Sequence, residues 1–101
     1  MNVDSTLRLA IMNKRLLELR YKGKSRVVEP HDYGVRKGRE RLLVFQLSTS
    51  TATGRKQSGW RLLDVAGIEQ LQMGASEFAG SRAEPGHSHM TWDVLYARVG
   101  A

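Results

Sequence analysis

The chain has 101 residues, of which 41% are hydrophobic and 26% charged, so one globular domain spanning residues 1–101 is expected. It has no cysteine, which excludes disulfides, thiolate metal sites and a cysteine nucleophile, and which suits a reducing compartment. The N-terminus has no secretory pattern, and no apolar run approaches the roughly 20 residues that a membrane-spanning helix needs. We therefore expect a cytoplasmic protein with no membrane segment.

The net charge of +6 lies in one part of the chain, residues 14–41, and the rest is neutral overall. A cluster of this kind is typical of a surface that binds phosphate, nucleic acid or another acidic partner. It is also typical of a solvated face that only keeps a protein soluble. The basic residues of this segment are Lys14, Arg15, Arg20, Lys22, Lys24, Arg26, Arg36, Lys37, Arg39 and Arg41.

The N-terminal part predicts a helix followed by a strand. Apolar residues at helical spacing over residues 5–13 predict a short helix that Ser5 or Asp4 caps. Apolar and charged side chains alternate over residues 17–21, which predicts a half-buried strand. The next residues, 22–24, are turn material because they contain a glycine between two lysines.

Two more strands are expected in the middle of the chain. The first covers residues 25–29 and ends at Pro30, because proline has no N–H to donate to a ladder. His31 to Gly38 contains two glycines and is expected to be a loop. An apolar run over residues 42–47 predicts a central strand, and the serine-, threonine- and glycine-rich residues 48–58 predict a surface loop.

The C-terminal half is expected to add a strand over residues 59–65 and a fifth strand or short helical turn within residues 66–73. Residues 74–89 are expected to be irregular. Apolar residues within 92–99 follow helical spacing and favour a C-terminal helix, although they also permit a strand. These elements predict a mainly β fold with a short N-terminal helix. The strands form either a small β-barrel or a strongly bent five-stranded antiparallel sheet.

Residues 7–73 resemble a WYL domain. The likeness includes the helix before the first strand, the spacing of tyrosine, arginine and proline across residues 21–30, and the central and fourth strands. The family's Trp-Tyr-Leu tripeptide falls at Arg41-Leu42-Leu43, where only the leucine matches. The matching stretches are Ala10-Ile11, Leu17 to Tyr21, Arg26 to Pro30, Gly59 to Asp64, Ile68 and Leu71.

The resemblance implies an Sm-like small β-barrel that senses a ligand or binds nucleic acid. WYL domains occur in bacterial transcription regulators, usually beside a winged-helix DNA-binding domain. This chain would be a stand-alone member, with residues 74–101 as a C-terminal extension. Arg26 matches the family's arginine, and Arg61 lies in the matching fourth strand.

Three arginines are the first candidates for binding an anion: Arg26, Arg41 and Arg61. A guanidinium group is planar and has five donors, so it pairs in a two-pronged way with phosphate or carboxylate. The alternative is that each arginine forms an ion pair at the sheet surface. The acidic candidates for such pairs are Glu18, Glu29 and Asp64.

The expected loop between the second and third strands mixes aromatic and basic side chains, which suits single-stranded nucleic acid because bases stack on aromatic faces while cations neutralise the backbone. The alternative is a structured turn in which Asp32 caps backbone amides. The candidate binding residues of this loop are His31, Tyr33, Arg36, Lys37 and Arg39.

Catalysis is not expected. His31, His87 and His89 are possible metal ligands, but no carboxylate stands at a motif-like spacing beside them, so we expect neither a metal nor another cofactor. No nucleophile elbow is present. The sequence thus favours a non-enzymatic regulatory module that recognises nucleic acid or a phosphate-bearing small molecule through a basic patch. A protein-interaction or oligomerisation subunit that assembles through edge strands is the alternative.

Overall fold

Strands make up most of the computed structural model, which describes residues 2–50, 56–82 and 91–100. A 3-10 turn, Val65–Gly67, joins the fourth strand to the fifth. The elements in chain order are α1 (Val3–Met12), β1 (Arg15–Tyr21), β2 (Lys24–Arg36), β3 (Arg39–Ser50), β4 (Lys56–Asp64), β5 (Ile68–Glu77) and β6 (Val94–Arg98).

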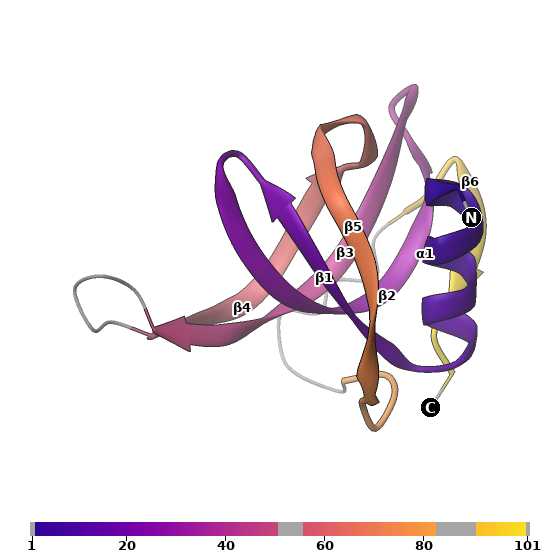
Figure 1. Ribbon diagram of the computed structural model, residues 1–101. Coiled ribbons are helices and arrows are strands. Elements are labelled where there is room, and N and C mark those ends of the chain that lie inside the picture. The colour runs from indigo at the N-terminus through magenta and orange to yellow at the C-terminus, as the bar shows by residue number, and fades with distance from the viewer. Residues whose placement is uncertain (1, 51–55, 83–90, 101) are drawn as a thin grey trace.

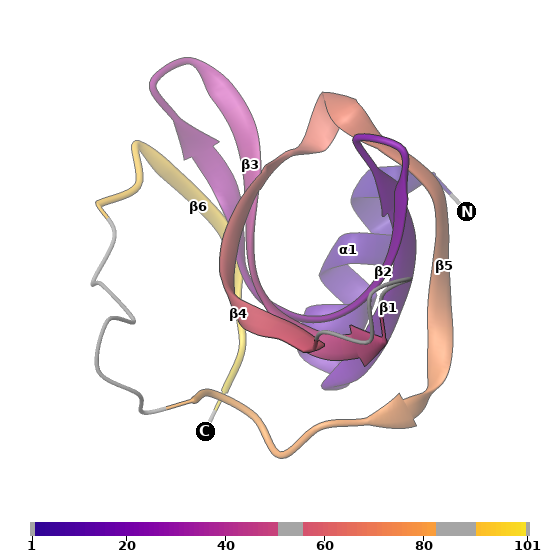
Figure 2. The same ribbon diagram turned by 90° about the vertical axis from the view of Figure 1, so that its left-hand side faces the viewer.

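The strands form one antiparallel sheet in the order β4-β3-β2-β1-β5, and β6 pairs with the second half of β2. The sheet curls strongly on itself, as Figures 1 and 2 show. It does not close, because no pairing joins β4 to β5 in the described ranges. The mainly β fold and the strongly bent sheet are confirmed.

Helix α1 covers one end of the curl (Figure 1). Asn2 caps the helix, since its side-chain oxygen accepts a hydrogen bond from the Ser5 amide at 2.8 Å. The helix therefore begins slightly before the predicted residue 5. Its apolar face is fully buried, and it joins the core of side chains on the concave face of the sheet. This core contains Leu7, Ala10, Ile11, Leu17, Leu19, Tyr21, Val28, Tyr33, Leu42, Val44, Leu63 and Val99.

Strand β2 corrects the prediction that Pro30 ends a strand. It continues to Arg36, so the segment expected to be a loop is mostly strand, and only the turn at Lys37-Gly38 remains. Proline is tolerated at position 30 because β2 has no partner strand on one of its two sides at this point. On that side, pairing with β1 ends at Val28 and pairing with β6 begins at Asp32. The missing N–H of Pro30 therefore breaks no ladder there.

The C-terminal segment is a strand, so the favoured C-terminal helix is wrong and the alternative, a strand, is confirmed. Residues 94–98 form β6 and lie antiparallel to β2. The pairing is fixed at its end by Asp32, whose carboxylate accepts hydrogen bonds from the Arg98 guanidinium at 3.0 and 3.1 Å and from Trp92 Nε1 at 3.2 Å. Tertiary pairing has overridden the helical spacing of these apolar residues.

Other boundaries differ in detail. The strand predicted over residues 42–47 extends to both sides as β3, and the expected loop over 48–58 contains the ends of β3 and β4, with residues 51–55 outside the described ranges. The first part of the segment expected to be irregular, residues 74–77, belongs to β5. No helix in the described part of the chain is long and apolar enough to cross a membrane.

Candidate anion-binding site

Two of the three candidate arginines lie on the concave face of the sheet. Residues paired across antiparallel strands share a face, and alternate residues of a strand point to the same side. Arg26 pairs with the buried Leu19, and Arg61 pairs with the buried Val44. Both side chains therefore lie on the side that carries the core.

The Arg26 guanidinium is held over β1 and β3 by neutral groups. Nη1 donates to Gln46 Oε1 at 3.1 Å, and Nη2 donates to the Tyr21 carbonyl at 3.3 Å. The group also lies over the Tyr21 ring, with Cζ 5.4 Å from the ring centroid. Its Nε is buried and has no hydrogen-bond partner within the described residues. Arg26 is thus positioned without a carboxylate.

Arg61 approaches the same region from β4. Its Nη1 donates to the Trp60 carbonyl at 2.9 Å. The position that a Cβ would take on Gly59 lies 3.2 Å from this nitrogen, and Gly59 has a φ of +142°, which other residues rarely adopt. Gly59 pairs with Gln46, so Arg61 and Arg26 flank Gln46 from its two sides. Glycine at this position leaves room for the second guanidinium.

The charges of these two arginines are not neutralised. Within the described ranges, neither forms an ion pair, and the hydrogen bonds of each go to a carbonyl or an amide oxygen. Four other arginines behave differently, because each of them is bound to a carboxylate. These pairs are Arg8–Asp4, Arg39–Asp64, Arg82–Glu29 and Arg98–Asp32, with distances of 2.6–3.1 Å. Four further arginines, Arg15, Arg20, Arg36 and Arg41, also have no carboxylate partner within the described ranges. Arg26 and Arg61 are distinguished by combining an unpaired charge with a position beside Gln46.

Gln46 completes the site as a third donor. Its side chain is almost fully buried, and its Oε1 is already used by Arg26. The part of the amide that remains is the NH2 group, which only donates. Two guanidinium groups and one amide NH2 group therefore lie on the same face of three neighbouring strands, and within the described ranges neither guanidinium group contacts a carboxylate. We call Arg26, Gln46 and Arg61 the concave donor cluster. It suits an anion with several acceptor oxygens.

The third candidate arginine lies elsewhere. Arg41 pairs with Gly34 and Asp64, one residue before the buried, inward-facing Leu42, so its side chain leaves β3 on the convex face. Its Nε is buried without a hydrogen-bond partner in the described part of the chain. Arg41 therefore does not converge with Arg26 and Arg61.

His31 is buried and unavailable to a base. Its Nδ1 lies 2.9 Å from the Glu29 carbonyl, and its Nε2 accepts a weak hydrogen bond from the Arg82 amide at 3.4 Å. The ring packs against Trp60 and Phe78. His87 and His89 lie outside the described residues, and the described ranges contain no group of three side chains arranged to hold a metal.

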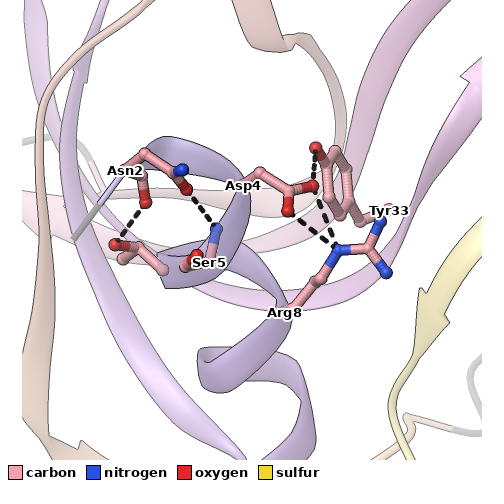
Figure 3. A network of polar contacts seen from close by, with 6 residues as sticks. Asn2, Asp4, Ser5, Arg8 and Tyr33 are labelled. Atoms are coloured by element: carbon pink, nitrogen blue, oxygen red, sulfur yellow. Dashed lines mark hydrogen bonds and ion pairs between the residues drawn. The ribbon is translucent and has the colours of Figure 1, made fainter.

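Tyr33 is also buried and connects β2 to α1. Its hydroxyl donates to Asp4 Oδ1 at 2.8 Å, and Asp4 also accepts from Arg8 Nε at 3.0 Å (Figure 3). The Arg8 guanidinium lies over the Tyr96 ring, 4.8 Å from its centroid. Burial raises the pKa of Tyr33 well above its ordinary value, and the hydrogen bond to Asp4 raises it further. The Tyr33 hydroxyl and Arg8 lower the pKa of Asp4. The ring therefore supports the fold.

Replacing Tyr33 by phenylalanine keeps the buried ring and removes only the hydroxyl. We expect Tyr33→Phe to lower the free energy of unfolding at pH 7. Because folding lowers the pKa of Asp4, the ionised Asp4 carboxylate stabilises the folded state above about pH 4, and this stabilisation is lost as the pH falls. Because folding raises the pKa of Tyr33, the protonated Tyr33 hydroxyl stabilises the folded state at neutral pH, and this stabilisation is lost as the pH rises above 10. Urea unfolding of both proteins from pH 2.5 to 11 should show a gap that narrows at both ends; a constant gap would contradict this account.

The remaining candidates surround the turn between β2 and β3. Arg36 pairs with Arg39 in the strand register, Lys37 is exposed, and the Lys37 amide donates to Asp93 Oδ2 at 2.7 Å. The ion pair of Arg39 with Asp64 neutralises part of this charge. This turn lies at the opposite end of β2 from the turn that precedes Arg26. The structure therefore divides the predicted site into two separate regions.

Two contributors to the cluster were not predicted. Gln46 is the only polar residue in the apolar run 42–47, and a single amide in a central strand was the available signal. Gly59 was correctly assigned to a strand, but the sequence carries no signal for its positive φ of +142°. Comparisons with family models, with curated proteins and with solved structures find no match.

Proposed function

We propose that this protein is a non-enzymatic regulatory module that binds an anionic ligand, either nucleic acid or a nucleotide-like molecule, through the concave donor cluster. The observation that carries the proposal is the position of Arg26 and Arg61. Both guanidinium groups lie on one face, flank Gln46, and lack a carboxylate partner within the described ranges. Like charges held together repel each other, and a bound anion removes that repulsion.

The surroundings of the cluster favour the same role. Lys24 is exposed and stands on the same side of β2 as Arg26, and Lys22 lies at the adjoining turn. These lysines add positive charge at the end of the curl where a ligand would arrive, which speeds the association of an anion. The resemblance to WYL domains supports a regulatory role in the cytoplasm. These features are independent of the contacts of the arginines.

The test measures the binding of fluorescent single-stranded and double-stranded oligonucleotides by anisotropy, at salt concentrations from about 50 to about 300 mM. We expect affinity to fall steeply with salt. Arg26→Gln and Arg61→Gln should each weaken binding by about tenfold or more, because a hydrogen bond to a charged group is lost. Nucleotides would be tested by thermal shift, where binding raises the melting temperature.

Arg39→Gln is the matched control, because it removes one positive charge from an exposed arginine that is paired with Asp64 and lies outside the cluster. We expect this variant to bind within about twofold of the parent protein, since exposed ion pairs contribute little. Absence of binding to every oligonucleotide and nucleotide at low salt would overturn the proposal. Equal losses in all three variants would show general charge attraction instead of a site.

A second function has support from the free edges of the sheet. β4 and β5 end the strand order, and each has one unpaired edge within the described ranges. Unpaired edges can add a strand from another chain. The protein would then act as an oligomerisation or protein-interaction subunit. Light scattering tests self-association: a mass that rises with concentration supports it, and a monomer at all concentrations contradicts it.

A further inference from the structure

We infer that the concave donor cluster recognises a terminal phosphate monoester, as at the phosphorylated end of a nucleotide or an oligonucleotide. The inference rests on the proposed function and narrows it from anions in general to one group. It depends on three properties of the cluster: the charge that it presents, the directions from which its donors approach, and the side from which a ligand can reach it.

The charge of the cluster matches a monoester better than a diester. Arg26 and Arg61 carry two positive charges without an ion pair in the described ranges. A phosphate monoester carries a charge of about −1.5 to −2 at pH 7, because its second pKa is about 6. An internal phosphodiester carries about one negative charge. Two guanidinium groups are therefore neutralised fully only by the monoester.

The donors come from three strands. Arg26 belongs to β2, Gln46 to β3 and Arg61 to β4, which are neighbouring strands of the strongly curled sheet (Figure 2). A carboxylate offers two oxygens in one plane, whereas a monoester has three terminal oxygens that point in different directions. Several donors supplied by three neighbouring strands of a bent sheet suit a tetrahedral group better than a planar one. The geometry thus favours phosphate over carboxylate.

The cluster also has an apolar floor. On each of the three strands, the next residue on the same face toward α1 is a buried apolar one: Val28 on β2, Val44 on β3 and Leu63 on β4. Beyond them, α1 covers the end of the curl (Figure 1). A strand of nucleic acid therefore cannot continue along the concave face past the arginines. This closed side favours a group at the end of a molecule over an internal phosphate.

The experiment compares ligands that differ only at the phosphate. Isothermal titration would use a nucleoside, its 5′-monophosphate and its cyclic 3′,5′-phosphodiester, and anisotropy would use one oligonucleotide with and without a 5′- or 3′-phosphate. We expect the monophosphate and the phosphorylated oligonucleotide to bind at least about tenfold more tightly than their counterparts. The preference should grow from pH 5 to pH 7.5 as the monoester loses its second proton. Inorganic phosphate should compete, and acetate should not.

Three variants test whether the preference for a terminal phosphate depends on the concave donor cluster. Arg26→Gln and Arg61→Gln should abolish the preference for the terminal phosphate, while Arg39→Gln should retain it. Thermal unfolding of each variant without ligand shows whether it is folded. If Arg26→Gln is not folded, Arg26→Lys replaces it, because lysine keeps the positive charge but lacks the planar, two-pronged guanidinium group. Equal binding of monoester and diester, or of both oligonucleotides, would overturn this inference and leave the proposed function intact. Absence of binding by every anion would overturn both.

Discussion

A methyl group added at Gly34 is expected to detach β6 from β2 and to lower the free energy of unfolding by about 3 kcal/mol. The Cβ of Gly34→Ala would overlap the Val94 carbonyl oxygen and lie 3.0 Å from Leu95 Cα. Both obstacles are backbone atoms, so no change of rotamer relieves them. Separation of the strands would also pull Arg98 from Asp32, which is buried.

Two amides report on this pairing: Asp93 donates to the Val35 carbonyl at 2.9 Å, and Val99 donates to the His31 carbonyl at 2.8 Å. Hydrogen exchange at both should accelerate in Gly34→Ala, and the melting temperature should fall by roughly 10–20 °C. Gly100→Ala is the control, since a Cβ there meets no atom within 4 Å. Unchanged protection of the two amides would contradict the expected detachment.

Much of the sheet could be predicted from sequence because local patterns determined it. Alternating side chains over residues 17–21 and the apolar run over 42–47 both gave strands. The path of β2 through Pro30 could not be predicted, because it depends on where β1 stops and β6 starts along the other side of the strand. The same long-range pairing decided between helix and strand for residues 92–99.

Replacing Arg82 by methionine is expected to cost about 2–3 kcal/mol, because it leaves the carboxylate of Glu29 buried without its cation. In the parent structure Arg82 Nε and Nη2 donate to the two oxygens of Glu29 at 2.6 and 3.0 Å, and the Glu29 side chain is 9% exposed. The guanidinium also lies 3.8 Å from the centroid of the Phe45 ring. Methionine retains the apolar contact and removes the charge.

The double variant Glu29→Met with Arg82→Met separates the ion pair from the packing. Removal of both charges should make it more stable than Arg82→Met alone, because no unpaired charge remains buried. Arg39→Met is the matched surface control, with an expected cost below about 0.5 kcal/mol, since the Arg39 side chain is 67% exposed. Urea unfolding measures all four proteins. A double variant less stable than Arg82→Met would contradict this explanation.

The sequence predicted the two arginines of the candidate site, but it did not predict Gln46 or show which arginines lie together. Clustered charge identified Arg26, and strand alternation is compatible with an inward-facing Arg61. However, charge alone does not distinguish a free arginine from one that holds the fold together. Arg39 has a carboxylate partner 25 residues away, at Asp64, and such partners are known only when distant segments are placed side by side.

The double pairing of β2 has a consequence for how the chain folds during synthesis. Its first half can pair with β1 as soon as the two-residue turn between them is made, whereas its second half must wait for β6, about sixty residues later. At a synthesis rate of about 5–20 residues per second, that wait lasts several seconds. Throughout it, residues 32–35 expose an open row of backbone donors and acceptors. In a nascent chain this is the segment most available to chaperones and to mistaken partners.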